Sequence, residues 1–379
     1  MGLGRLRSVN NLLNPVGAPP VGIDFGVGSL KVLQLNTGDA PSLIAAAALE
    51  TPENLIADHP RRLEFQLEAL PKLIREGGFK GKRGVCALPA PQTQCKHLQI
   101  ARAPGVSLSS LVEAALPDAP GFEPGRAMVR HIEVGEPEQQ GKASSKTEVI
   151  CLAAPRDLVA TLMQGLKAAK LEPVGMHSEF QALLAGFEKQ VADPTLVLDL
   201  GLATTKVLIA AGGKALFART IEMGGRHLDE TLAAQLRITA SQAKRERLSM
   251  QNVVVEGGSE CARDVAEGAA PAAMKVARPK ADLSEPLEIL LDEIRMCLRY
   301  HRSLFPNAPV NRVLFTGGES RHRAMCEHMA RAIGMQSSCA DAMAQVSRTG
   351  QEPARGVDLM RTQPGWAVPL GLCLSKTDL

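Results

Sequence analysis

The chain is poor in aromatic residues and carries no strong charge of either sign. Its 379 residues include one Trp, one Tyr and nine Phe, and the formal net charge is +3. No dense stripe of Lys and Arg with interleaved aromatics occurs, so we expect no nucleic-acid partner. The core must instead be built from Leu, Val, Ile, Ala and Met.

Long apolar runs are also missing. No segment approaches the roughly 18 apolar residues of a membrane-spanning helix, and the basic start of the chain lacks the apolar core of a signal peptide. We therefore expect a cytoplasmic protein that meets a membrane only through a partner. Residues 1–20, which end in a stretch rich in Pro and Gly, are expected to form a flexible tail.

Three familiar site patterns are absent as well. The eight Cys include no C-x-x-C pair, which excludes the common zinc and thioredoxin-like motifs. Neither the Walker A loop, G-x-x-x-x-G-K-[ST], nor the dinucleotide fingerprint, G-x-G-x-x-G, occurs. A phosphate site in this chain must therefore be built in another way.

Two segments half a chain apart repeat one design. Residues 22–38 read GIDFGVGSLKVLQLNTG, and residues 197–213 read VLDLGLATTKVLIAAGG. At a shift of 175 positions, Ser29 meets Thr204 and six residues are identical: Asp24/Asp199, Gly26/Gly201, Lys31/Lys206, Val32/Val207, Leu33/Leu208 and Gly38/Gly213. Either segment alone is compatible with an ordinary β-hairpin, but the repetition predicts a fold with two related halves.

Strand-like and helix-like segments alternate along the rest of the chain, which is typical of an α/β protein. Apolar residues at helical spacing predict helices around 63–74, 158–169 and 285–298. Residues 256–282 are rich in Gly, Ala, Pro and charge without periodicity, which predicts a flexible loop. A third glycine turn, at 316–320, follows a short apolar strand.

Phosphate chemistry gives the three glycine turns a common purpose. Backbone N–H groups bind phosphate oxygens at close range, and glycine suits such turns because a Cβ would obstruct the approach. The hydroxyls of Ser29, Thr204 and Thr205 can add hydrogen bonds. Asp24 and Asp199, at strand ends, can orient Mg²⁺ through water, since Mg²⁺ prefers oxygen ligands and retains part of its hydration shell.

The order of these turns resembles the actin-like superfamily, in which two related halves clamp ATP between two phosphate hairpins. Finer segments are similar to the PilM family of type IV pilus assembly proteins. They are CLAAPRDLVATLMQGLKAAKLEPVGMHSE at 151–179, RTIEMGGRHLDETL at 219–232, LDEIRMCLRYHRSLFPNAPVNRVLFTGGES at 291–320 and PGWAVPLGLCL at 364–374. The resemblance extends from residue 21 to 379 and is loosest over 100–145 and 250–283.

The resemblance implies which residues meet ATP and Mg²⁺. Those that match the two phosphate hairpins are Asp24, Gly26, Ser29, Lys31, Asp199, Gly201, Thr204 and Thr205. Those that match the adenosine side are Gly224, Gly225, Lys244, Arg247, Gly317 and Gly318. Asp24 and Asp199 match the positions expected to hold Mg²⁺ through water.

The resemblance also implies an actin-like (ribonuclease H-like) α/β fold with duplicated halves and a small α/β insertion of the kind found in FtsA and PilM. The expected parts are a first-half core at 21–91 with 173–194 and 355–379, an insertion at 92–172, a second-half core at 195–225 and 310–354, and a second-half subdomain at 226–309.

Two positions depart from the family pattern. Relatives commonly carry Ala-Glu-x-x-Lys, with a Glu that reaches the ribose, whereas residues 243–247 read AKRER and place Lys244 and Arg247 at the Glu and Lys positions. The KRER run by itself predicts a solvated helix face. Glu319 follows the glycine pair where relatives often have a small residue, and an anion there is expected to repel ATP.

By resemblance, the chain is expected to be an ATP-binding cytoplasmic scaffold at the inner-membrane face of a type IV pilus or related machine. Its expected partner is a bitopic inner-membrane protein of PilN type, gripped through a short N-terminal peptide. No residue that would orient or deprotonate an attacking water can be identified, so the catalytic residues are unknown and weak ATPase activity at most is expected.

Two alternatives remain open. The first is an actin-like protein of another machine, such as cell division or type II secretion. The ending LGLCLSKTDL leaves no room for the amphipathic membrane helix usual in FtsA-type proteins, which disfavours division. The second is a small-molecule kinase of the same superfamily, which would require a catalytic carboxylate that the sequence does not locate.

Overall fold

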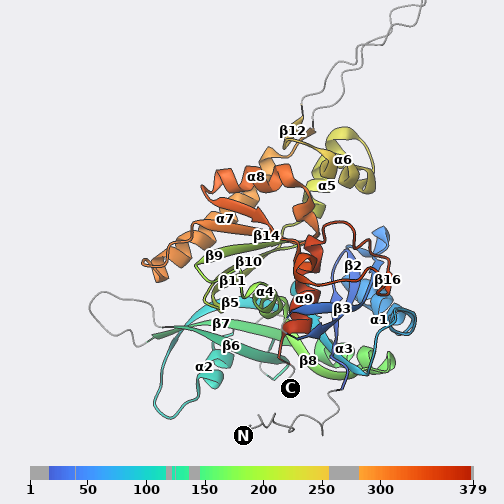
Figure 1. Cartoon of the computed structure of the whole chain (residues 1–379). Coiled ribbons are helices and arrows are strands. Elements are labelled where there is room, and N and C mark those ends of the chain that lie inside the picture. Colours follow the sequence, from blue (N-terminus) through green and yellow to red (C-terminus); the bar gives the residue numbers. More distant parts are fainter. Residues whose placement is uncertain are drawn as a thin grey trace, which may run out of the picture.

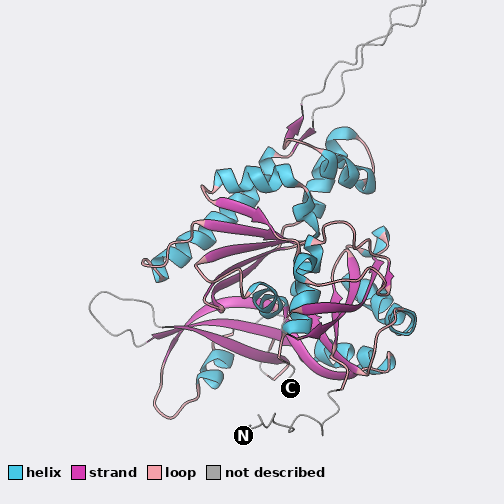
Figure 2. Cartoon of the chain, viewed as in Figure 1, coloured by secondary structure: helices cyan, strands magenta, loops and turns pink. Residues whose placement is uncertain are grey.

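The described part of the protein forms three main sheets and one short ribbon, with helices packed against the sheets (Figures 1 and 2). The structure, a computed structural model, describes residues 17–38, 40–116, 122–123, 125–135, 146–255 and 281–376. Within these ranges no helix combines the length and the apolar character needed to cross a membrane.

Two segments predicted to be flexible lie largely outside the described residues. These are the tail at 1–20, described only from residue 17, and the loop at 256–282, described only from residue 281. The last two residues of that loop are in fact a strand, β13 (Ala281–Asp282), which pairs with β12 (Val254–Val255). The predicted loop therefore extended two residues too far.

The first sheet has six strands built around the first hairpin. Their order is β16 (Ala354–Arg355), β3 (Pro41–Glu50), β2 (Ser29–Thr37), β1 (Val21–Phe25), β4 (Arg83–Leu88) and β8 (Glu172–Ser178). β1 is antiparallel to β2 and parallel to β4, and all five of its residues are buried. This register places Asp24 directly opposite Lys31.

Two helices cover one face of the first sheet. α1 (His59–Glu76) begins after Asp58, whose side chain accepts a hydrogen bond from the Arg61 N–H group. α3 (Arg156–Ala168) buries Leu162 and Leu166 in the same core. We predicted α3 as part of the insertion at 92–172, yet its packing joins it to the first half.

The second sheet repeats the arrangement of the first. Its order is β11 (Lys214–Ile221), β10 (Thr205–Ala211), β9 (Thr195–Leu200), β14 (Arg312–Thr316) and β15 (Gln336–Cys339). β9 is antiparallel to β10 and parallel to β14, just as β1 lies between β2 and β4. Asp199 and Lys206 therefore face one another as Asp24 and Lys31 do.

Helices also cover the outer face of the second sheet. They are α5 (Gly225–Leu236), α7 (Ser284–Leu304) and α8 (Arg323–Ala332), with α6 (Ala240–Ser249) packed on α5. The apolar stripe predicted for 285–298 is the buried face of α7. Two sheets of matching topology with helices outside them confirm the predicted duplicated α/β fold.

Two short helices fill the space between the sheets (Figure 1). α4 (Glu179–Phe187) and α9 (Ala367–Leu374) cross with their backbones in contact, because a Cβ added to Gly371 would lie 1.7 Å from the carbonyl oxygen of Ala182. The chain returns to the first sheet before α9, since Leu43 N–H already donates to the carbonyl oxygen of Ser347. The return thus starts earlier than the predicted residue 355.

The insertion is a three-stranded antiparallel sheet, β5 (Gln94–Ala101), β7 (Lys146–Pro155) and β6 (Ala127–Gly135), with α2 (Leu108–Ala114) packed on it. It leaves the first half after β4 but contacts the second half through His97, which stacks on Phe217 at 4.5 Å. The Nε2 atom of His97 accepts a hydrogen bond from Ala218 N–H, and its Nδ1 lies 3.0 Å from Glu148. Tyr300 also donates to Glu148.

The contact between α4 and α9 generates a stability prediction. Gly371→Ala should lower the free energy of unfolding by roughly 2–4 kcal/mol, because the added methyl group must push the two helices apart. Urea unfolding followed by circular dichroism measures this change. Gly38→Ala is the control, since nothing lies within 4 Å of its added Cβ. Equal stability of the two variants would contradict the close packing of α4 and α9.

Candidate functional site

The turns of the two repeated hairpins face one another across a cleft of about 590 Å³. A Cβ added to Gly28 in the first turn would lie 3.5 Å from the Leu202 side chain in the second, so the two turns lie close together at this point. The predicted residues that line this cleft are Asp24, Gly26, Ser29, Lys31, Asp199, Gly201, Thr204, Lys244, Gly317 and Gly318. Segments far apart in the sequence are thus brought to one site.

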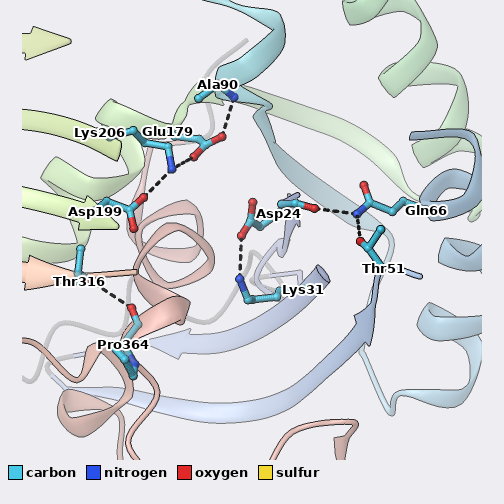
Figure 3. A network of polar contacts seen from close by, with 11 residues as sticks. Asp24, Lys31, Thr51, Gln66, Ala90, Glu179, Asp199, Lys206, Thr316 and Pro364 are labelled. Atoms are coloured by element: carbon cyan, nitrogen blue, oxygen red, sulfur yellow. Dashed lines mark hydrogen bonds and ion pairs between the residues drawn. The ribbon is translucent and has the colours of Figure 1, made fainter. Parts of the chain in front are cut away.

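The first turn is held by a polar contact from α1. The Gln66 side-chain amide donates to the carbonyl oxygen of Gly26 at 2.8 Å and to the Thr51 hydroxyl at 3.3 Å (Figure 3). Thr51 N–H in turn donates to the carbonyl oxygen of Gly28. These bonds occupy the carbonyl groups of Gly26 and Gly28.

An acid–lysine network lies at the centre of the cleft (Figure 3). The ammonium group of Lys206 lies 2.6 Å from Asp199 Oδ2 and 2.5 Å from Glu179 Oε2, and all three side chains are almost fully buried. The other carboxylate oxygen of Glu179 accepts a hydrogen bond from Ala90 N–H at 2.7 Å. The matching pair in the first half is looser, with 3.6 Å between Lys31 Nζ and Asp24 Oδ2.

Burial and the charges of this network shift the pKa values of Asp24 and Lys206. Burial raises the pKa of Asp24 to about 6, against the opposing effect of Lys31, and the nearby Glu179 carboxylate adds to the rise. Burial alone would lower the pKa of Lys206, but Asp199 and Glu179 raise it above its usual value. Lys206 is therefore a permanent cation of the cleft.

Thr205 and the pair Gly224-Gly225 do not line the cleft. The Thr205 hydroxyl donates to the carbonyl oxygen of Met223 at 2.8 Å. Its proton is therefore not free for the phosphate oxygen that we predicted as its acceptor. A Cβ on Gly224 would lie 2.4 Å from the carbonyl oxygen of Gly201. These glycines allow the start of α5 to pack against the second turn, and the Gly225 N–H donates to Gly201.

The third glycine turn closes the far end of the cleft. Gly317 has a φ of +90°, which disfavours residues with a side chain, and its N–H donates to the carbonyl oxygen of Pro364. The Thr316 hydroxyl donates to the same oxygen at 2.8 Å. Gly318 begins a short 3-10 turn that leads into α8. Residues 356–358, 361–363 and 365–368 complete this wall.

Arg247 lies behind the cleft wall, fully buried between two carboxylates. Its guanidinium donates to Asp229 at 2.7 Å and to Glu319 at 2.5 Å. The prediction that KRER is a solvated face is therefore wrong for Arg247, and Arg247 is not among the residues that line the cleft. Arg247 and Lys244, which lies 4.0 Å from Glu319 Oε1, together balance the charges of Asp229 and Glu319 and so oppose the predicted repulsion of ATP.

Sequence reasoning missed Glu179 and the wall at 356–368. Glu179 is the first residue of α4, after the N-cap Ser178, and the following helix is almost entirely apolar. A lone acid at the start of a buried helix was the available signal, although an acid at a helix start is common for other reasons. The wall residues carry no motif.

The donor set of the cleft only partly fits Mg²⁺. Asp24 has one long contact with Lys31 and could meet a hydrated ion, whereas Asp199 is engaged by Lys206. Among the described residues, no group of three or more His, Cys, Asp or Glu is placed to hold a metal ion. Direct coordination of one Mg²⁺ ion by both aspartates therefore does not fit this arrangement, and their contact with Mg²⁺ through water stays a prediction.

The raised pKa of Asp24 generates a pH prediction. An acid whose folded-state pKa lies above its unfolded value destabilises the fold once it ionises, so stability should fall as pH rises from about 4 to about 6. For a shift of this size the loss is on the order of 2–3 kcal/mol. Asp24→Asn should remove this loss and be more stable than the natural protein at neutral pH.

Urea unfolding at a series of pH values measures this effect. Asp157→Asn, an exposed aspartate on α3, is the control and should leave the shape of the pH profile unchanged. A profile for Asp24→Asn that falls as steeply between these pH values as that of the natural protein would contradict the assignment to Asp24.

Comparisons with known proteins bear on the fold. No protein-family model matches the sequence, and a search of curated proteins found no match. The structure is similar to a chain of a solved PilM–PilN type IV pilus biogenesis complex, with a TM-score of 0.69 and 19% identity over 94% of this chain and 98% of that chain.

Two further solved structures are more distant. MreB5 of Spiroplasma citri bound to AMPPNP gives a TM-score of 0.47 and 14% identity over 93% of this chain and 94% of that chain. The ethanolamine utilization protein EutJ of Carboxydothermus hydrogenoformans gives 0.46 and 15% identity over 97% and 93%. The match with the pilus complex confirms the expected resemblance in fold: the chain has an actin-like α/β fold arranged as in PilM-type proteins.

Proposed function

We propose that this protein is a nucleotide-binding scaffold of a type IV pilus or related assembly machine. The observation that carries the proposal is the convergence of two repeated Asp-x-Gly hairpins, each with its own lysine, on one cleft. The similarity to a chain of a PilM–PilN complex supports the choice of machine. The bound nucleotide would be ATP or ADP, with its phosphates between the hairpin turns.

In this proposal each part of the cleft has a task. N–H groups of the glycine turns and the hydroxyls of Ser29 and Thr204 donate to phosphate oxygens, and Lys31 and Lys206 supply positive charge. The base and ribose lie toward Gly317, Gly318 and Lys244. A Mg²⁺ ion that accompanies the nucleotide would meet Asp24 through water. The nucleotide would be held to set the angle between the halves, with slow turnover at most.

The partner in this proposal is a bitopic inner-membrane protein of PilN type, which would place the scaffold at the inner-membrane face. A second cavity, of about 220 Å³, supports a peptide partner. It lies where the insertion meets β8 and α4, with apolar lining that includes Met128, Leu152, Val159 and Met176. Residues of β6 and β8 line this cavity, and within the described part of the chain each of these strands lies at the edge of its sheet.

An extended peptide with apolar side chains fits this cavity. Edge strands offer backbone groups for strand addition, while an apolar cavity accepts the side chains. Gln94 lines the cavity and its buried side-chain oxygen has no hydrogen-bond partner, so it can accept from a peptide N–H group. We therefore propose that the N-terminal peptide of the membrane partner binds here.

Nucleotide binding can be blocked without disturbing the core. Gly318 lines the cleft and nothing lies within 4 Å of a Cβ added to it, so Gly318→Leu should fill the site yet fold normally. Isothermal titration with ATP should show binding by the natural protein and a loss of at least about tenfold in affinity for the variant. Gly38→Leu, outside the cleft, should bind as the natural protein does. Absence of ATP and ADP binding by the natural protein would contradict the proposal.

The partner can be tested by photo-crosslinking in cells. A photoreactive residue in place of Met163, which lines the second cavity, should crosslink to the N-terminal segment of a single-pass inner-membrane protein. Val159→Trp should abolish this crosslink by filling the cavity, whereas Ala160→Trp, at an exposed position of the same helix, should preserve it. A crosslink to division or secretion components would keep the fold and replace the assigned machine.

A further inference from the structure

Lys206 is placed differently from an ordinary phosphate-binding lysine. It lies on β10 directly opposite Asp199 on β9, and only 6% of the residue is exposed. Two of the three N–H donors of an ammonium group are taken by Asp199 and Glu179, at 2.6 and 2.5 Å. Charge-assisted contacts of this length are among the strong ones in proteins.

The comparison with the first half shows that this placement is specific. Lys31 occupies the equivalent position in the duplicated hairpin, yet its ammonium group lies 3.6 Å from Asp24 and its side chain is 20% exposed. No third residue is drawn into that pair within the described part of the cleft. Two positions related by the internal repeat therefore hold a loose pair in one half and a tight, buried triad in the other.

One carboxylate of the triad is held from a second direction as well. Glu179 accepts a hydrogen bond from Ala90 N–H, which opposes its turning away from Lys206. Asp199 is buried near the end of a fully buried strand. Two buried carboxylates that converge on one point are suitable surroundings for a divalent cation, and here that point is taken by an ammonium group.

We propose that Lys206 is the resident cation of the cleft, in the place between Asp199 and Glu179 that a divalent ion would otherwise take, and that nucleotide binding therefore depends little on Mg²⁺. The part that concerns nucleotide rests on the proposed function. The centre of the cleft holds three carboxylates, of Asp24, Asp199 and Glu179, against the ammonium groups of Lys31 and Lys206. Without Lys206 these carboxylates would face the phosphates with one lysine and would require an added cation.

The first test needs no nucleotide. Thermal unfolding of the full chain is measured with MgCl₂ and with NaCl at equal ionic strength. The natural protein should show the same Tm in both salts. Lys206→Met should lose stability and regain roughly 2–4 °C in MgCl₂, because Mg²⁺ can then occupy the vacated carboxylates. Lys244→Met, a lysine at the cleft wall outside the triad, should respond as the natural protein does.

The second test measures the affinity for ATP by isothermal titration with Mg²⁺ or with EDTA. The affinity of the natural protein for ATP should differ by less than about threefold between the two media. The affinity of Lys206→Met should be more than about tenfold higher with Mg²⁺ than with EDTA. Lys244→Met should bind more weakly in both media with an unchanged ratio between them. If Lys206→Met does not fold, the affinities of the natural protein in the two media still show whether its ATP binding depends on Mg²⁺.

The outcomes separate the inference from the proposed function. A natural protein that binds ATP only with Mg²⁺, or whose Tm rises in MgCl₂ as that of Lys206→Met does, overturns the role of Lys206. A natural protein that binds no nucleotide in either medium overturns the proposed function. In that case the thermal comparison still decides whether Lys206 is the resident cation.

Discussion

The contact on which the site depends is the ion pair between Lys206 and Glu179. Lys206 belongs to the second sheet, whereas Glu179 begins a helix of the layer between the sheets and is bonded to Ala90 at the end of the first sheet. A single buried ammonium group thus connects both halves at the floor of the cleft. Because the pair is nearly inaccessible to water, salt screens it much less than a surface pair, and removal of one partner would leave a buried charge.

Internal repetition made most of the fold predictable. The six identities between the hairpins specify the same strand pairing twice, and the structure confirms that Asp24 and Asp199 occupy equivalent positions opposite lysines. Helical periodicity likewise located α1, α3 and α7. These features depend on local spacing, which a sequence carries directly. The packing of α3 on the first half was not predictable in this way, because an amphipathic helix does not indicate which sheet it covers.

Three side chains differ from their predicted roles for one physical reason. Thr205 and Arg247 were predicted to meet the nucleotide and Glu319 to repel it, and each instead has a partner within the protein. Charge alone could not show that Arg247 and Glu319 compensate one another, since 72 positions separate them in sequence. Glu179 was missed for the opposite reason, because its role arises from Lys206 and Ala90, and no local pattern connects the three. In each case, a partner distant in sequence therefore determines what the side chain contacts.

The attachment of the insertion has a mechanical consequence. The chain enters the insertion from the first sheet, yet His97, Glu148 and Tyr300 clasp it to the second half. The covalent chain on one side and these contacts on the other make the insertion a bridge between the two halves. A change in the angle between the halves must therefore either break these contacts or move the insertion relative to the first sheet. In the second case the displacement falls on the boundary between the insertion and the first sheet, where the apolar cavity lies.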